Sequence, residues 1–387
     1  MTFAQLALIC AVALLGPLLS LQRTLRAPVV IGEMAVGIGL GATGLRVLDS
    51  GNATFAFLAS AGFALVMFVA GSHVPVRERA LRSGLRAGAL RALLAGGLAV
   101  GAGLGVAALF GDGHGAIYAV LMASSSAGVI MPLLAGTPLT APAIAAMLPQ
   151  IALADAACIV LLPLVLDPPH VPRALLGIAV LVALVLLAFA ALRRFELSGR
   201  RRRLHELSEE HELAIELRTL LALLFGLAAV ATLLHVSVML AGFGLGVAVA
   251  GVGEPRRVAK QLFAITEGFF APIFFVWLGA SLDLRELADH PSAIALGLVL
   301  GLAAVLVHSL VALTGQPLAV AALTAAQLGV PVAAVTLGDT LGTWQPGERA
   351  AVLLAALVTI AAAAVASRGA IRVATAHSRP AARRSSG

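Results

Sequence analysis

Apolar runs long enough to cross a membrane constrain this chain more than any other feature. A helix needs about 20 consecutive apolar residues to span a bilayer, and on that measure we distinguish thirteen segments. Only 12% of the residues are charged, whereas soluble domains carry about 25%. The sequence therefore predicts an all-α polytopic membrane protein with about thirteen transmembrane helices. The predicted segments are residues 3–22, 28–48, 54–73, 88–110, 115–135, 141–166, 172–192, 213–234, 236–252, 261–281, 291–314, 317–338 and 349–367.

The basic residues indicate how these helices are oriented, because cytoplasmic loops collect Lys and Arg. With the N-terminus outside, the cytoplasmic side receives all of the 26 basic residues except Arg46, Arg173, Arg285 and Arg349. The net charge of +7 then reflects the basic residues that set membrane orientation. No nucleic acid is therefore expected as a partner. Arginine and alanine abundance favours a GC-rich bacterial genome. We expect a multi-pass protein of the bacterial inner (plasma) membrane, with a cytoplasmic C-terminus and no cleavable signal peptide.

The order of the segments predicts an internal repeat. The charged loop Arg193–Arg218 divides the chain into six segments, one connecting segment and six more. A single connecting segment places the two halves in opposite orientations, as in inverted-repeat transporters. We therefore expect two inverted six-helix repeats.

Two segments at corresponding places in these halves contain helix-breaking residues. The fifth carries Ser124, Ser125 and Ser126 ahead of Pro132, and the twelfth carries Gln327, Gly329 and Pro331. Broken helices in matching positions indicate a substrate site near the middle of the membrane. For each stretch taken alone, close helix packing through small residues is an equally good interpretation. Their matched positions favour broken helices 5 and 12.

Asp155 is the residue around which the functional hypothesis is built. It lies near the middle of an apolar segment, Leu148–Leu166, where an ionised Asp costs roughly 2.5–3.5 kcal/mol on insertion scales. Such a residue should face a wet cavity or spend part of its time protonated, which suits a site where a proton and a metal cation compete. The hydroxyls and backbone of Ser124–Ser126 would supply neutral oxygens. Gln150 lies five residues earlier, about 140° around a helix, so it is a poor co-ligand of Asp155.

Short motifs occur in a fixed order along nearly the whole chain. The most specific is Ala271–Leu284, with its Pro-x-Phe-Phe start and Gly279. Together they resemble the monovalent cation:proton antiporter superfamily, in particular its bacterial sodium or potassium/proton antiporter branch. The other motifs are Pro28–Gly41, Phe63–Gly71, Ser124–Ser126 with Met131–Leu134, and Gly242–Gly246.

The resemblance implies an ion-transporting core that moves against a panel domain, with homodimers formed through the panel. Asp155 falls where this family places its ion-binding aspartate, and the transported cation is then the only metal expected there. The broken helices 5 and 12 would cross beside it. The implied boundaries are 1–87 for the first part of the panel/dimer domain, 88–168 for the first half of the core, 169–212 for the connecting helix and cytoplasmic basic loop, 213–284 for the second part of the panel and its link to the core, 285–368 for the second half of the core, and 369–387 for the cytoplasmic basic tail.

The chain departs from the family pattern at three places. Many members have two adjacent polar residues at the ion site, but Ala154 precedes Asp155 here. A Gly-Glu pair common in the second crossing helix is absent. Many members also carry a Lys or Arg in the preceding segment, where this chain has His308. Since histidine titrates near neutral pH, His308 is a candidate counter-charge or pH sensor; a neutral histidine hydrogen-bonded between helices is the alternative.

Two further acidic residues lie in predicted spans. Glu33 is only five residues past Pro28, which favours a position at the cytoplasmic interface over a second proton site. Glu267 lies closer to mid-depth, and an access-path carboxylate and a helix contact are equally good interpretations of it. Both are therefore candidate accessory carboxylates.

The functional hypothesis is a secondary-active antiporter, and not an enzyme. It would exchange Na⁺ or K⁺ for protons by alternating access, with one carboxylate binding either ion. No nucleotide-binding loop, nucleophile elbow or HExxH pattern occurs in the sequence, and no cofactor is expected. One alternative is a sodium-coupled organic-anion carrier of the same architecture, which would need more polar residues around the crossing. The other is a non-transporting membrane sensor whose ion site has decayed.

Overall fold

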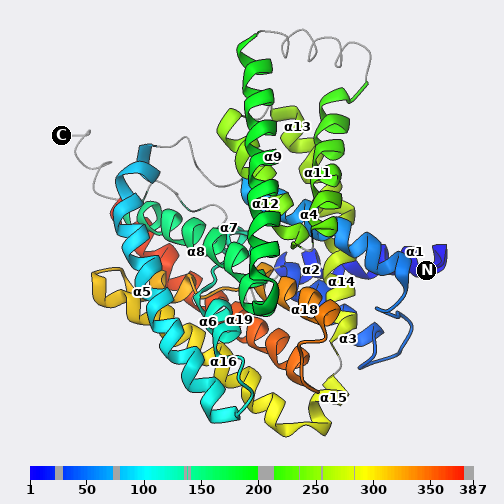
Figure 1. The fold of residues 1–387 in the computed structure, drawn as a ribbon, viewed down its shortest axis with the longest axis vertical. Helices are drawn as coiled ribbons and strands as arrows, with labels where there is room; N and C mark the ends of the chain where they lie inside the picture. Colours follow the sequence, from blue (N-terminus) through cyan, green and yellow to red (C-terminus); the bar gives the residue numbers. More distant parts are fainter. Residues whose placement is uncertain are drawn as a thin grey trace. The chain divides into compact units, whose positions relative to one another are not determined.

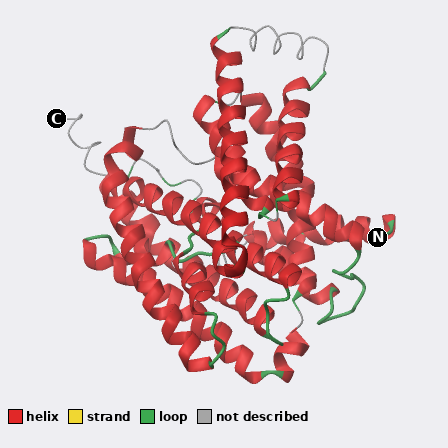
Figure 2. Ribbon diagram, in the orientation of Figure 1, coloured by secondary structure: helices red, strands yellow, loops and turns green. Residues whose placement is uncertain are grey.

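The computed structural model is built from helices wherever the chain is described (Figure 2). The described residues are 1–21, 29–72, 79–134, 137, 141–198, 213–234, 236–253, 256–282 and 284–378. The central part of the predicted basic loop, residues 199–212, and the end of the predicted basic tail, residues 379–387, lie outside these ranges.

The predicted membrane segments are found as helices, and the all-α polytopic fold class is confirmed. Among the described residues, 8 helices are long and apolar enough to cross a membrane, and each corresponds to a predicted segment. The remaining predicted segments correspond to the shorter apolar helices Phe3–Leu18, Val29–Leu40, Gly115–Met131, Val238–Val252 and Gly329–Leu341.

The chain divides into two compact units, and each is formed by separate stretches of sequence. Unit 1 comprises Met1–Leu21, Val29–Arg77 and Pro169–Leu282, and unit 2 comprises Gln22–Pro28, Glu78–Pro168 and Asp283–Gly387. The helices of unit 1 are α1 (Phe3–Ala13), α2 (Leu15–Leu21), α3 (Val29–Leu40), α4 (Ala53–Ser72), α9 (Val171–Leu197), α11 (Ile215–Leu233), α12 (Val238–Val252), α13 (Arg256–Ile265), a π-helical turn η2 (Thr266–Phe270) and α14 (Ala271–Ser281); the short 3₁₀ helix η1 (Pro168–His170) precedes α9.

Glycine allows two helix pairs of unit 1 to approach closely. A Cβ added at Gly246 of α12 would lie 2.1 Å from the Phe68 carbonyl oxygen of α4. One added at Gly279 of α14 would lie 2.1 Å from the Met34 carbonyl oxygen of α3. These distances leave no room for a side chain, so α12 packs on α4, and α14 on α3, through backbone contact. Both glycines belong to motifs that the sequence analysis identified.

Unit 2 contains the two predicted broken segments. Its helices are α5 (Arg79–Phe110), α6 (Gly115–Ala123), α7 (Ala127–Leu133), α8 (Pro142–Leu166), α15 (Leu284–Asp289), α16 (Pro291–Leu310), the 3₁₀ helix η3 (Val311–Thr314), α17 (Leu318–Leu323), α18 (Gly329–Leu341) and α19 (Glu348–Ser378).

A similar arrangement of neighbours occurs twice in unit 2. The long helix α5 packs against both α6 and α8, and α6 packs against α8. Likewise α16 packs against both α17 and α19, and α17 packs against α19. Figure 1 shows these long helices as the cyan, green-cyan, yellow and orange-red ribbons of the unit. Each set therefore consists of two unbroken helices with an interrupted one between them.

The interruptions occur where the sequence predicts them, so broken helices 5 and 12 are confirmed. The fifth segment is α6 followed by α7, and Ser124 between them has an extended backbone with φ −70° and ψ 154°. The twelfth is α17 followed by α18, which begins at Gly329. Pro331 lies in the first turn of α18, where its missing N–H has no helical partner to lose. The break therefore precedes Pro331.

Candidate functional site

Residues at the two helix interruptions of unit 2 form hydrogen bonds directly with each other. The Ser125 hydroxyl donates a hydrogen bond to the Thr324 carbonyl oxygen at 2.5 Å. The Ser126 backbone N–H donates to the Ala326 carbonyl oxygen at 2.8 Å. Because the unwound residues have lost their helical hydrogen bonds, each break supplies partners that the other one needs. Two stretches about 200 residues apart in sequence thereby form one crossing.

Gln327 contributes two further hydrogen bonds at this crossing. Its side-chain amide donates to the Met122 carbonyl oxygen at 3.3 Å, near the C-terminal end of α6. Its backbone N–H donates to the Thr359 hydroxyl of α19 at 3.3 Å. Carbonyls in the last turn of a helix have no intrahelical partner, so Gln327 satisfies one that α6 leaves open.

His308 of α16 lies between the two breaks and is fully buried. Its Nε2 atom is 3.1 Å from the Met122 carbonyl oxygen, so this nitrogen carries a proton and donates. Its Nδ1 atom is 2.9 Å from the Thr324 hydroxyl. The imidazole ring thus joins the C-terminal ends of the half-helices α6 and α17. Helix C-terminal ends carry partial negative charge, which favours a cation beside them.

Asp155 lies in the interior of unit 2, on α8. Its side chain is only 4% exposed, and the backbone N–H of Ala127, the first residue of α7, donates to its carboxylate. None of the ion pairs among the described residues involves Asp155. The carboxylate therefore faces the first helix interruption with no cationic side chain beside it, and a mobile cation or a proton can neutralise it.

The three serines next to Ala127 differ in how their hydroxyl groups are used. Ser124 donates to the Leu121 carbonyl oxygen at 2.8 Å, and Ser125 donates to Thr324. Ser126 is 3% exposed, and its backbone N–H donates to the Ala326 carbonyl oxygen. Since each bonded hydroxyl keeps lone pairs on its oxygen, all three can offer neutral oxygen ligands to a cation.

The structure brings some of the predicted site residues together and separates others. Asp155, His308, Gln327 and the three serines lie in unit 2, and Gly329 and Pro331 open the helix that follows the second break. Glu33 and Glu267 lie in unit 1, where their carboxylates are close enough to interact electrostatically. Glu33 is buried, whereas Glu267 is exposed on the π-helical turn.

Thr324 is a residue of the crossing that the sequence analysis missed. Its hydroxyl can donate its one proton to the Ala321 carbonyl oxygen at 2.7 Å or to Nδ1 of His308, and it accepts from the Gln150 amide at 3.4 Å. A threonine three residues before Gln327 in an otherwise apolar stretch was the available signal. It carried little weight because threonine is common in membrane helices, where its hydroxyl bonds to its own helix.

A second polar cluster occurs at the other end of α6. The Tyr118 hydroxyl lies 2.5 Å from Asp112 and 2.6 Å from Glu348, and His114 binds the same Glu348 carboxylate. These contacts join the loop between α5 and α6 to the start of α19. Among the described residues, no group of three His, Cys, Asp or Glu side chains has the geometry of a metal site.

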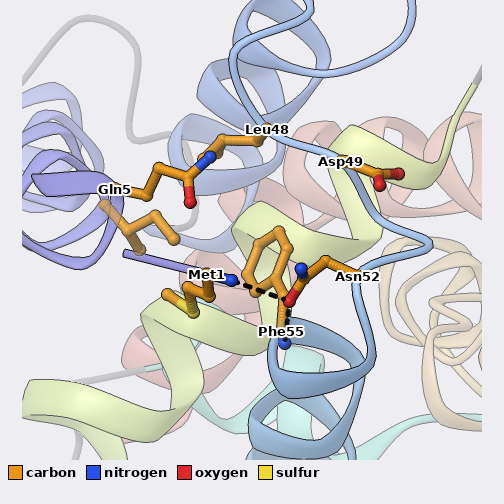
Figure 3. A pocket seen from close by; sticks show the side chains of 7 residues that line it. Met1, Gln5, Leu48, Asp49, Asn52 and Phe55 are labelled. Carbon is orange, nitrogen blue, oxygen red and sulfur yellow. Dashed lines mark hydrogen bonds between the residues drawn. The ribbon is translucent and has the colours of Figure 1, made fainter. Parts of the chain in front are cut away.

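Unit 1 has a small pocket beside its N-terminal helix (Figure 3). There the Asn52 side chain accepts hydrogen bonds from the Met1 amino group at 3.1 Å and from the Phe55 backbone at 3.2 Å. Its remaining lining combines apolar side chains such as Ile9 and Leu48 with the polar Gln5 and Asp49. The pocket contains none of the predicted site residues.

Comparisons with known proteins identify the family and support the fold. The family model described as "Sodium/hydrogen exchanger, transmembrane" matches residues 10–372. The protein YjbQ of Bacillus subtilis (strain 168), named as a candidate Na⁺/H⁺ antiporter, is 24% identical over 379 residues, which cover 92% of this chain and 61% of YjbQ. The chain thus spans about three fifths of the length of that relative. Among solved structures, the sodium proton antiporter MjNhaP1 from Methanocaldococcus jannaschii has a TM-score of 0.64 at 15% identity, with 95% of this chain and 97% of the other covered.

Proposed function

Because this chain belongs to the sodium/hydrogen exchanger family, a family of transporters and not of enzymes, we propose that it exchanges a monovalent cation, Na⁺ or K⁺, for protons across the membrane. The observation that carries this proposal is the position of Asp155. Its carboxylate is buried in unit 2, next to a helix interruption, and none of the cationic side chains that the structure describes pairs with it.

The exchange follows from what one buried carboxylate can hold. A charge removed from water must be neutralised, and at Asp155 either a bound proton or a bound cation can do so. A cation that binds displaces the proton, and a proton that binds displaces the cation. If the site opens to one side of the membrane at a time, this exclusive occupancy converts a gradient of one ion into transport of the other.

Neutral oxygens around the carboxylate would complete the cation site. Ser126 is the strongest candidate, because it is buried and adjacent to Ala127, whose backbone N–H donates to the Asp155 carboxylate. The oxygens of Ser124 and Ser125 and the carbonyls of the unwound backbone are further candidates. Oxygen ligands of this kind suit hard metal cations, which is consistent with Na⁺ or K⁺ as substrate.

His308 is proposed as the counter-charge of the crossing. It occupies the place where the family resemblance implies a Lys or Arg, and both of its ring nitrogens contact groups that can accept a hydrogen bond. A protonated ring would donate to the Met122 carbonyl and to the Thr324 hydroxyl at once. Protonation would therefore stabilise the contact between the two breaks, so His308 would also make the crossing sensitive to pH.

The two units are proposed to have separate roles. Unit 2 holds Asp155 and both interrupted helices, so we assign it as the ion-transporting core and unit 1 as the panel that forms a homodimer. Glu33 and Glu267 then belong to the panel, where accessory steps in ion access are the role open to them. The N-terminus is proposed to lie outside and the C-terminus in the cytoplasm of a bacterial inner membrane.

The first prediction is that Asp155→Asn abolishes exchange. Asparagine has nearly the same shape but cannot take up and release a proton or carry the charge that binds a cation. The measurement is recovery of a pH-sensitive dye in everted membrane vesicles after addition of Na⁺, K⁺ or Li⁺. We expect cation-specific recovery with the native protein and none above background with the variant.

Controls separate this function from the alternatives. Asp167, just after the end of α8, provides a matched substitution, and Asp167→Asn should retain exchange. Normal exchange by Asp155→Asn would refute the proposal. A native protein that is well expressed but moves no protons with any of the three cations would favour a non-transporting sensor, and uptake of an organic anion that requires Na⁺ would favour the organic-anion carrier.

A further inference from the structure

Gln150 has a buried side-chain oxygen that the structure leaves without a partner. The residue lies on α8, and its side chain is 1% exposed. Its amide nitrogen is 3.4 Å from the Thr324 hydroxyl, but its Oε1 atom has no hydrogen-bond partner among the described residues. Leaving a buried polar group unsatisfied is unfavourable, so the open oxygen of Gln150 calls for a ligand.

The hydrogen bonds of Thr324 determine which end of the amide faces it. The single hydroxyl proton of Thr324 can go to the Ala321 carbonyl oxygen at 2.7 Å or to Nδ1 of His308 at 2.9 Å. In either case the hydroxyl has no proton left for Gln150, and it can only accept from it. The NH₂ end of the amide must therefore face Thr324, which leaves the oxygen as the open atom.

The position of Gln150 separates it from the proposed carboxylate site. Gln150 and Asp155 are five residues apart on one helix, which corresponds to about 7.5 Å along the axis and about 140° around it. The two side chains cannot easily coordinate one ion together. A cation bound by Gln150 would therefore occupy a different position, on the Thr324 side of the crossing.

We infer that the Gln150 amide oxygen is a ligand for the transported cation at a second station on its route through unit 2. This inference rests on the proposed exchange function and adds a site to it. An amide oxygen is an acceptor that stays neutral and unprotonated at physiological pH. The station would consequently hold Na⁺ or K⁺ but no proton, so that the two ions compete at Asp155 alone.

The test compares two substitutions of similar size. Gln150→Met removes the oxygen and keeps the length of the side chain, whereas Gln150→Glu keeps an oxygen at the same place. With Gln150→Met we expect the half-saturating concentration of Na⁺ or K⁺ to rise about tenfold, with the maximal rate changed less than twofold. With Gln150→Glu we expect a half-saturating concentration of Na⁺ or K⁺ that is close to that of the native protein or lower. Exchange in everted vesicles, with NaCl or KCl varied at fixed pH, measures both quantities.

The pH profile supplies a readout that a purely structural role would not give. At saturating cation, the pH dependence of exchange should be the same for Gln150→Met as for the native protein, because protons bind elsewhere. A matched control is Gln316→Met, since Gln316 is also buried and both of its amide atoms lack partners, but it precedes α17 and lies away from the crossing. This control should leave the half-saturating concentration unchanged.

The outcomes distinguish the inference from the function on which it rests. If the native protein exchanges cations and Gln150→Met leaves the half-saturating concentration within twofold, the second station is refuted and water is the partner of the oxygen. A similar rise in the half-saturating concentration with Gln316→Met would also refute the second station. If the native protein shows no exchange at all, the proposed function itself fails. In that case, Na⁺ or K⁺ binding to the purified protein, followed by thermal unfolding, still tests whether Gln150→Met weakens a cation site.

Discussion

At the scale of single residues, the crossing depends on a few polar groups that share their hydrogen bonds. Thr324 and Met122 each contact more than one partner, and His308 contacts both of them. Thr324, Met122 and His308 are all buried in unit 2. In a buried network, removing one member leaves the others unsatisfied, so the cost exceeds that of one hydrogen bond.

Thr324→Val should therefore destabilise the protein. Valine has nearly the same shape, but it leaves Nδ1 of His308 and the Gln150 amide without their shared hydroxyl, at a cost of roughly 1–3 kcal/mol. We expect a lower thermal unfolding midpoint for the purified protein in detergent. Thr324→Ser restores the hydroxyl and should recover most of the loss. Equal stability of the valine and serine variants would show that the hydroxyl contributes nothing.

At the scale of helices, close approach through small residues positions the broken segments. The α5–α6 contact is an example, because a Cβ added at Gly103 of α5 would lie 2.6 Å from the backbone of Ala119 on α6. The α16–α19 contact resembles it, since a Cβ at Gly301 would lie 2.7 Å from the Val358 side chain. Neither the backbone of Ala119 nor the Cβ of Val358, which is fixed to its backbone, can move aside as the end of a flexible side chain can. Neither contact should therefore tolerate a larger residue.

Two glycines one helical half-turn apart on α5 test this directly. Gly103→Ala should separate α5 from α6, displace the first helix interruption and reduce both stability and exchange. Gly101→Ala is the matched control, because an added Cβ there has nothing within 4 Å, and alanine favours a helix by about 1 kcal/mol over glycine. Vesicle exchange and thermal unfolding should show a loss for the first variant only. Comparable effects of both substitutions would refute the role of close packing.

At the scale of the whole molecule, the single carboxylate of the proposed ion site bears on the stoichiometry. Asp155 is preceded by Ala154, so no second acidic side chain adjoins it on α8. One carboxylate releases one proton for each monovalent cation that binds. The net charge moved in a complete cycle would then be zero.

Exchange should therefore not respond to an imposed membrane potential. In proteoliposomes containing the purified protein, a potassium diffusion potential set with valinomycin should leave the rate of Na⁺/H⁺ exchange unchanged for either sign of the potential. Collapse of the pH gradient with an uncoupler is the control that the assay detects proton movement. A rate that rises with one sign and falls with the other would show that more than one proton moves per cation.

The sequence by itself determined that the chain is an all-α membrane protein and where its helices are interrupted. Both follow from local properties, namely the length of apolar runs and the weakness of Ser, Gly and Pro in a helix interior. It also singled out Asp155, because a carboxylate within an apolar span is conspicuous whatever surrounds it. What the tertiary structure alone decided is which groups meet at the crossing. Thr324 joins His308 and Gln150, and Gln327 reaches Met122, through contacts between residues far apart in sequence. Hydrogen bonds of that kind depend on how helices pack, and no local pattern of residue types encodes them.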